Sequence, residues 1–398
     1  MRIGLITAIR RSADGFVRAE LPLAGRSVLA WQVALMHSLG AERIVCLSAT
    51  ATGEVLHMQR NTEAGGASFH TLQGFSALPG LVRAEDDLII LSDGLVPDPS
   101  VIQAIFDGNG ALRRVVTAIP AENPLATAYP EDFERIDAAR HWAGLLVMRG
   151  AGVQPLEDFP ADSDPVSLLL RLALQAGTPC HDLRARDLAS ERWLLVDSAA
   201  EAAHAGQAMV DAAAIQSDRS CPSSKLATLV VRGHAPGGLL QGANVSQATA
   251  LTLLIAGVIA AALGLATTGL LLAATGAFCA VVAETYGTIA ARLWRETVAV
   301  PRKAVLAWVV DGFAALATFF ALAPLPLWQP LAALGPLVFG LARIASRKKD
   351  SALSVMASDR TGLLLVLAAA AATGFLPEIC ACLALGLLAA LLLRADQL

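Results

Sequence analysis

Two patterns of apolar residues divide the chain. Up to about Arg232, short apolar runs alternate with charged and polar stretches, as in a soluble domain. From about Val245 onward, Ala, Leu, Val and Gly dominate in long runs. This asymmetry is typical of a soluble domain joined to a membrane domain. We therefore expect three parts, namely residues 1–213, a connecting stretch over 214–243, and a membrane domain over 244–398.

The first part alternates short apolar runs with amphipathic ones. Ser27 is placed to cap a helix from Val28 to Leu39, and Pro99 is placed to open another helix. Alternating strands and helices of this kind predict a mainly parallel α/β sheet that is covered on both faces. The runs that read as strands are residues 3–9, 43–47, 88–91, 114–117 and 144–148.

The last part contains apolar runs close to the 20 or so residues that a helix needs to cross a bilayer. They predict an all-α, six-helix transmembrane domain. Residues 214–243 are rich in Ser, Gly and Pro, and we interpret them as a connector at the membrane surface. The predicted spans are residues 245–264, 267–283, 304–323, 327–341, 362–375 and 379–393.

Basic residues occur only at alternate ends of the predicted spans, which predicts the orientation of the chain. By the positive-inside rule, the soluble domain and both termini lie in the cytoplasm, at a bacterial-type inner (cell) membrane. The net charge of −4 and the lack of a basic, aromatic-rich patch argue against a nucleic-acid partner. The basic residues are Arg292, Arg295, Arg302 and Lys303, then Arg343, Arg347, Lys348, Lys349 and Arg360, and finally Arg394.

Charged residues also lie at the predicted membrane boundary. Glu284 ends an apolar helix, Arg292 follows it, and Asp311 lies inside the next apolar run. Ionisable groups in such places are costly and usually have a role. They could form a catalytic site, and an Asp311–Arg292 ion pair of purely structural purpose would satisfy the same pattern.

The stretch Glu284-Thr-Tyr-Gly-Thr-Ile-Ala-Ala-Arg292, with Asp311 after it, resembles the signature of the CDP-alcohol phosphatidyltransferases. That signature is an Asp, an Asp-Gly, an Ala-Arg and, further on, a Gly and two Asp at fixed spacing. Ala291 and Arg292 match, and Glu284 takes the place of the first Asp. The resemblance implies that Glu284 and Asp311 hold Mg²⁺ and that, with Arg292, they form the catalytic group. The other signature positions hold Gly287, Thr288, Pro301, Val305 and Val309.

Three segments in order, residues 21–29, 90–98 and 193–201, resemble the nucleotidyltransferase (GT-A-like) fold of sugar-phosphate and molybdenum-cofactor type enzymes. The resemblance implies that Asp93 and Asp197, on adjacent strand ends, bind Mg²⁺. From the residues themselves, Asp93 could instead open a turn with Gly94, and Asp197 or Ser198 could cap the next helix.

The loop after the first strand has only one glycine, Gly15, where the nucleotidyltransferase family has several. Arg10 and Arg11 are its candidate contacts for a nucleotide phosphate. Two solvated loop arginines would give the same sequence.

Together the two resemblances imply a membrane-bound phosphotransferase of polar-lipid or phosphodiester synthesis that uses a CDP-activated alcohol. The expected partners are CTP or a CDP-alcohol, a polyol phosphate or lipid acceptor, membrane lipids and a second copy of the chain in a homodimer. The alternative is a catalytically inactive fusion that binds nucleotide or lipid as a regulatory or scaffolding subunit.

Overall fold

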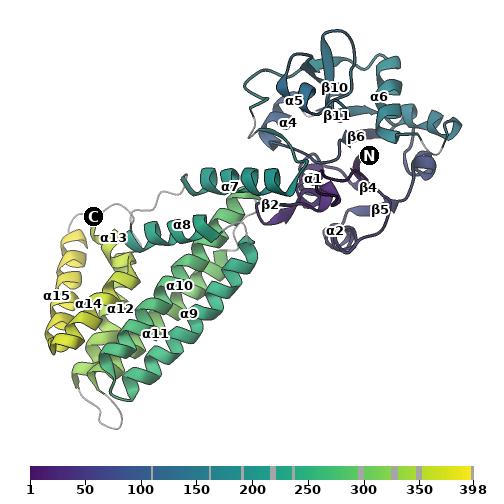
Figure 1. Ribbon diagram of the computed structural model, residues 1–398. Helices are drawn as coiled ribbons and strands as arrows, with labels where there is room; N and C mark the ends of the chain where they lie inside the picture. The colour runs from purple at the N-terminus through teal and green to yellow at the C-terminus, as the bar shows by residue number, and fades with distance from the viewer. Residues whose placement is uncertain are drawn as a thin grey trace. The chain divides into compact units, whose positions relative to one another are not determined.

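The chain forms two compact units, Met1–Ala208 and Met209–Leu398, in a computed structural model. The structure describes residues 1–108, 111–160, 163–189, 192–215, 221–234, 238–294, 300–323, 330–346 and 352–395. Figure 1 labels the elements of each unit.

The first unit is built on a seven-stranded sheet with the strand order β12-β10-β11-β6-β1-β4-β5. The neighbours of β1 and β4 are all parallel, and β10 is parallel to β12. Only β11 runs antiparallel to its two neighbours, β6 and β10. The expected mainly parallel α/β fold is therefore confirmed. The strands are β1 (Arg2–Ala8), β4 (Arg43–Ser48), β5 (Ser68–Leu72), β6 (Asp87–Leu91), β10 (Val115–Pro120), β11 (Arg140–Arg149) and β12 (Cys180–Asp182).

Both faces of this sheet are buried, as a parallel sheet requires. Along β1, Ile3 and Leu5 enter one apolar core, whereas Ile6 and Ala8 enter the other. Helix α1 covers the second face, and its cap is the predicted one, because Ser27 Oγ accepts a hydrogen bond from the Ala30 N–H at 3.0 Å. The helices of this unit are α1 (Val28–Ser38), α2 (Gly53–Ala64), α3 (Leu78–Leu81), α4 (Pro99–Phe106), α5 (Pro124–Ala128) and α6 (Pro165–Gln175).

Small two-stranded ribbons and short 3-10 turns complete the unit. The ribbon of β13 with β7 is antiparallel and is separate from the main sheet. The short strands are β2 (Pro22–Leu23), β3 (Arg26–Ser27), β7 (Leu95–Pro97), β8 (Asp107–Gly108), β9 (Ala111–Leu112) and β13 (Trp193–Leu195), and the 3-10 turns are η1 (Arg18–Glu20), η2 (Phe75–Ala77) and η3 (Gly150–Asp158).

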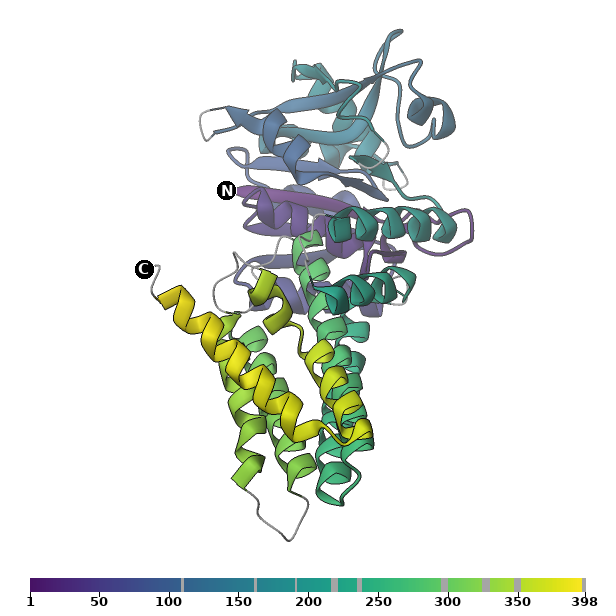
Figure 2. The same cartoon turned by 90° about the vertical axis from the view of Figure 1, so that its left-hand side faces the viewer.

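The second unit is entirely helical, as expected, and Figure 2 shows α15 (yellow) crossing in front of the other helices of this unit. Small residues let α9 and α10 approach closely, since a Cβ on Gly269 would lie 2.7 Å from the Gly257 carbonyl oxygen. The helices are α8 (Pro222–His234), α9 (Leu239–Ala262), α10 (Ala266–Leu293), α11 (Val300–Leu322), α12 (Leu334–Ala345), α13 (Ala352–Ser358), α14 (Arg360–Thr373) and α15 (Leu376–Ala395), after α7 (Ala199–Ile215).

The prediction of six spans was too high. Within the described ranges, four helices are long and apolar enough to cross a membrane, and they are α9, α10, α11 and α15. The predicted spans 327–341 and 362–375 correspond to shorter apolar helices, Pro330–Ala345 and Arg360–Thr373. With 14 residues, α14 rises about 21 Å, less than the roughly 30 Å of a bilayer core. Residues 327–329 lie outside the described residues.

Capping residues set the ends of the helices, which a count of apolar residues does not predict. Asp359 caps α14 by accepting from the Gly362 N–H, and Gly374 ends it with a φ of 80°. The first long helix of this unit begins at Leu239 rather than near Val245. The stretch interpreted as a connector, 214–243, contains α8.

Candidate functional site

A cavity of about 330 Å³ lies at the edge of the main sheet in the α/β unit. Its lining comes from the carboxyl ends of β1, β4 and β6 and from the segments that follow β5 and precede α6. Ligands of α/β folds bind at this edge of the sheet, because the loops there converge. The lining residues are Thr7, Ile9, Arg10, Leu47, Gln73, Gly74, Phe75, Ser92, Asp93, Glu131, Asp132, Glu134, Trp142, Ser163, Asp164, Pro165 and Val166.

Asp93 is held in the cavity wall by the backbone around it. It follows β6 in a tight turn, in which Gly94 has a φ of +77° and a Cβ there would lie 2.8 Å from the Val196 carbonyl oxygen. Buried Gln32 fixes this turn by donating through Nε2 to the Ser92 and Leu95 carbonyl oxygens, both at 2.9 Å. The sequence therefore allows little freedom in where the carboxylate lies.

The two carboxylate oxygens of Asp93 differ. Oδ2 accepts from the Ile9 N–H at 2.9 Å and from the Arg10 N–H at 2.8 Å. Oδ1 is buried and has no hydrogen-bond partner in the described part of the chain, and the residue is 2% exposed. Burial raises the pKa of Asp93 to about 6, although the two backbone N–H groups oppose the shift. Asp93, which lines the cavity, thus has one carboxylate oxygen without a hydrogen-bond donor among the described residues.

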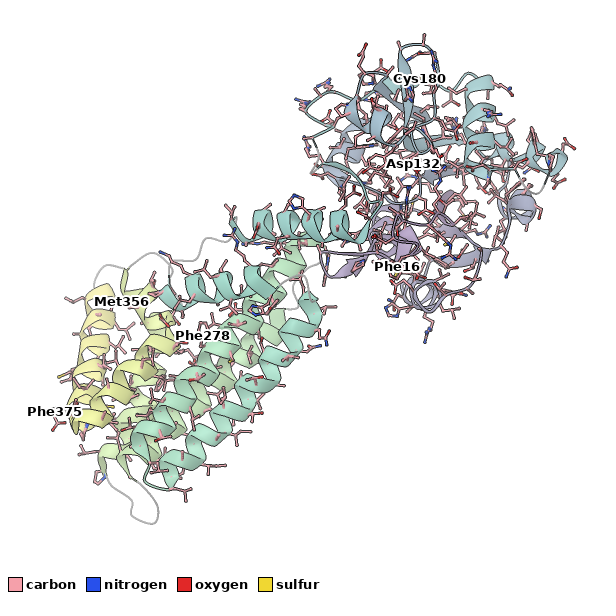
Figure 3. The ribbon with its side chains drawn as sticks, in the orientation of Figure 1. Phe16, Asp132, Cys180, Phe278, Met356 and Phe375 are labelled. Atoms are coloured by element: carbon pink, nitrogen blue, oxygen red, sulfur yellow. The ribbon has the colours of Figure 1, made fainter. Side chains whose placement is uncertain are left out.

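Arg18 occupies the centre of a buried ionic network beside Asp93. Its Nη1 lies 2.7 Å from Asp132 Oδ1, and its Nε lies 2.7 Å from Asp197 Oδ1. Asp132, labelled in Figure 3, also accepts from Arg10 Nη1 at 2.6 Å. Desolvation disfavours the charge on Arg18, but hydrogen bonds and Coulombic attraction to Asp132 and Asp197 outweigh it and raise its pKa. The Arg18 guanidinium is therefore charged at any physiological pH.

Asp197 follows a strand of a different sheet from the strand that precedes Asp93. It follows β13, and the Val196 N–H donates to the Gly94 carbonyl oxygen at 3.0 Å, so the two segments are adjacent. The Asp197 carboxylate, however, is paired with Arg18. Ser198 takes the capping role that the sequence left open, because its Oγ accepts from the Glu201 N–H at 3.2 Å at the start of α7.

The two loop arginines have separate surroundings. Arg10 lines the cavity, but it is paired with Asp132 and also donates through Nη2 to the Glu131 carbonyl oxygen at 3.0 Å. Arg11 is exposed and donates to the Gly15 carbonyl oxygen of its own loop at 2.8 Å. A role for either residue in phosphate binding stays a prediction.

In the helical unit, Asp311 is 7% exposed and bridges two arginines. Arg343 Nη1 lies 2.5 Å from Oδ2, and Arg360 Nε lies 2.5 Å from Oδ1. The Arg343 guanidinium also lies 3.6 Å from the centre of the Trp308 ring, a cation–π contact. The trio joins α11, α12 and α14.

The Asp311–Arg292 pair, which the sequence left open as an alternative, is not formed, because Asp311 pairs with Arg343 and Arg360 instead. Arg292 is exposed and donates to the Ala213 carbonyl oxygen at 3.2 Å, while Glu284 is exposed on α10. The sequence missed the actual partners of Asp311 because Arg343 and Arg360 lie 32 and 49 residues further along the chain.

The residues do not fit the magnesium sites that the two resemblances imply. Mg²⁺ is held by carboxylate and phosphate oxygens in near-octahedral geometry. Asp197 and Asp311 are already paired with guanidinium groups, and Asp93 offers one free oxygen. Among the residues that the structure describes, no three or more His, Cys, Asp or Glu side chains gather as a metal site would require.

Sequence reasoning also missed the residues that complete the cavity and its network. Arg18, Asp132 and Trp142 belong to no motif of their own. Arg18 is 114 residues from Asp132 and 179 residues from Asp197, so no local spacing could have paired them. The available signals were the strand end at Asp93 and the loop arginine Arg10, and both residues line the cavity.

No protein-family model matches the chain, and no curated protein matches it. Among solved structures it is similar to the inositol-1-phosphate CTP transferase from T. maritima, with 16% identity and a TM-score of 0.37 over 50% of this chain and 91% of that chain. It is also similar to a protein assigned as a glucose-1-phosphate thymidylyltransferase from Bacillus anthracis, with 9% identity and a TM-score of 0.39 over 52% of this chain and 94% of that chain.

Proposed function

We propose that this protein is a membrane-bound binding protein rather than a phosphotransferase. Its α/β unit would hold a small molecule in the cavity beside Asp93, and its apolar helices would anchor it in a cell membrane. Such a protein acts as a regulatory or scaffolding subunit for a partner that responds to the bound molecule.

The observation that carries the proposal is that candidate carboxylates form ion pairs with arginines of the same chain. Phosphoryl transfer depends on cations that neutralise and align the phosphates, most often carboxylate-bound Mg²⁺. Asp197 is paired with Arg18, and Asp311 is paired with Arg343 and Arg360. Freeing Asp311 for a metal would leave two largely buried guanidinium groups without their shared carboxylate, and breaking such a buried pair costs about 3–5 kcal/mol.

The cavity supports the binding half of the proposal. It has a fixed wall, since Gln32 and Gly94 hold the Asp93 turn, and it retains one unsatisfied acceptor. Preformed concave sites with few, well-placed polar groups are typical of small-molecule sites. An inner-membrane location with the α/β unit in the cytoplasm, and a homodimer, remain predictions from the sequence.

The rival function is the phosphotransferase of polar-lipid or phosphodiester synthesis. Only the free oxygen of Asp93 favours it, because a metal would need that oxygen. CTP, a CDP-alcohol, and a polyol phosphate or lipid acceptor would then be its substrates.

A measurement of catalytic turnover distinguishes a binding protein from a phosphotransferase. The full-length protein in nanodiscs is incubated with Mg²⁺ or Mn²⁺ and either CTP with polyol phosphates or CDP-alcohols with lipid acceptors. Release of pyrophosphate and of CMP is measured. We expect both rates to equal those of protein-free nanodiscs. A rate above background that Asp93→Asn or Asp311→Asn abolishes, while the exposed control Glu378→Gln keeps it, would overturn the proposal.

A further inference from the structure

The cavity beside Asp93 carries a strong excess of acidic side chains. Its lining contains one arginine, Arg10, and five carboxylates, namely Asp93, Glu131, Asp132, Glu134 and Asp164. We propose that this cavity binds a small organic amine in its protonated, ammonium form. The inference rests on the proposed function, since it names the class of ligand that the α/β unit holds.

The first argument is the acceptor that lacks a donor. Asp93 lines the cavity, and its buried Oδ1 has no hydrogen-bond partner among the described residues. A buried polar atom left without a partner is destabilising, and more so when it is charged. An ammonium N–H that reaches this oxygen would remove that cost and would pair the charge.

The second argument is the sign of the surrounding charge. Arg10 offsets only part of this charge, because it is bound to Asp132 and lies 3.8 Å from Asp164, and Arg18 also pairs with Asp132. Among the described residues, Asp93, Glu131 and Glu134 form no ion pair with an arginine, so the remaining charge of the lining is negative. The same field that attracts an ammonium group therefore repels the phosphates of a nucleotide.

The third argument is the character and size of the walls. Phe75 and Trp142, both almost fully buried, line the cavity together with Pro165 and Val166. Aromatic rings beside carboxylates suit organic cations, whose carbon atoms contact apolar walls while the charge is neutralised. A volume of about 330 Å³ suits a small metabolite. A bare divalent cation would leave these apolar walls unused.

Binding to the full-length protein in nanodiscs tests the proposal by calorimetry and thermal shift. The probes are two amines, ethanolamine and glucosamine, their neutral counterparts ethylene glycol and glucose, and CTP and MgCl₂. We expect at least one amine to bind at least tenfold more tightly than its neutral counterpart, a difference of about 1.4 kcal/mol. Its affinity should also fall as salt is added.

Variants then locate the binding. Asp93→Asn should weaken the amine at least tenfold, and Asp164→Asn at the exposed rim should weaken it less. Glu63→Gln, on the exposed face of α2, is the matched control and should bind as the parent does. Circular dichroism of each variant checks folding. If Asp93→Asn does not fold, Glu131→Gln and Asp164→Asn together must still weaken the amine.

The outcomes distinguish the inference from the function on which it rests. If neither amine binds at millimolar concentration, or if neutral counterparts bind equally well, the inference is wrong. If CTP binds without turnover, the inference fails while the proposed function stands. Turnover that depends on Asp93 would overturn the proposed function itself.

Discussion

Single side chains decide what the α/β unit can do, and Arg18 is the clearest case. A guanidinium group presents several donors in a fixed plane, so one arginine can hold two carboxylates at once. Arg18 does so with Asp132 and Asp197, and Asp132 accepts from Arg10 as well. Asp132 and Asp197 are therefore paired with an arginine of the same chain, whereas Asp93 is not.

Removal of the Arg18 charge should destabilise the α/β unit. Arg18→Met would leave Asp132 buried with Arg10 alone and would leave Asp197 without its guanidinium. Breaking a buried ion pair in this way costs about 3–5 kcal/mol. Chemical denaturation, followed by fluorescence of the tryptophans in the full-length protein, measures the change in the free energy of unfolding.

A compensating change controls for lost packing. Arg18→Met combined with Asp132→Asn should recover part of the loss, because the buried carboxylate is then also gone. A loss below about 0.5 kcal/mol for Arg18→Met alone, the range of ordinary surface substitutions, would contradict the role assigned to the network.

Cys46 offers a test of burial at one residue. Desolvation, reinforced by the negative charge of Asp93, raises the pKa of the Cys46 thiol to about 12. Only the thiolate reacts with alkylating agents, so at pH 8 the folded protein should leave Cys46 unmodified. Mass spectrometry after iodoacetamide treatment maps the modified sites.

Cys180, which is only partly buried, is the internal control and should be modified under the same conditions. After denaturation both residues should react at similar rates. Modification of Cys46 in the native protein as fast as that of Cys180 would show that the β4 strand is more open than the structure indicates.

Among the elements, three helices of the second unit share one acidic residue. Asp311 on α11 joins Arg343 of α12 to Arg360 of α14. We expect Asp311→Asn to destabilise the helical unit by about 3–5 kcal/mol, because two arginines would lose their shared carboxylate in largely apolar surroundings. The thermal midpoint in nanodiscs should fall, whether or not any substrate is present.

The matched control is Glu378→Gln, an exposed acidic residue in the first turn of α15. It should leave the midpoint within the error of the measurement. An unchanged midpoint for Asp311→Asn would show that the trio does not hold the helices together. Asp311 would then again be a candidate for a catalytic role.

Local sequence signals predicted elements well where periodicity and caps agreed. The strands β1, β4, β6 and β11 and the cap at Ser27 were found in this way. Strand β5 was missed because Ser68–Leu72 carries polar residues on an edge strand, where burial is partial. The shorter helices were predicted as spans because apolar composition alone does not detect capping residues, such as Asp359 and Gly374 at the two ends of α14.

For the whole molecule, the order of a mainly parallel α/β unit and an apolar helical unit could be predicted, because it follows from composition along the chain. The cavity could be anticipated only through Asp93 and Arg10, since a strand end and the loop after a strand are local features. Its charge balance could not, because it depends on contacts such as Arg18–Asp132 and Arg10–Asp132 that span more than a hundred residues. The arginines that pair with the candidate carboxylates are distant from them in the sequence, so the motifs alone did not predict these ion pairs.

The trio around Asp311 also constrains how the protein is made. Asp311 is synthesised before Arg343 and Arg360, so α11 initially carries an unpaired acid. α11 is one of the helices long and apolar enough to cross a membrane, and an Asp at the centre of an isolated membrane helix opposes insertion by about 2.5–3.5 kcal/mol. If α11 spans the membrane, we expect its insertion to be completed only when α12 and α14 have been synthesised, which would make the biogenesis of these helices cooperative.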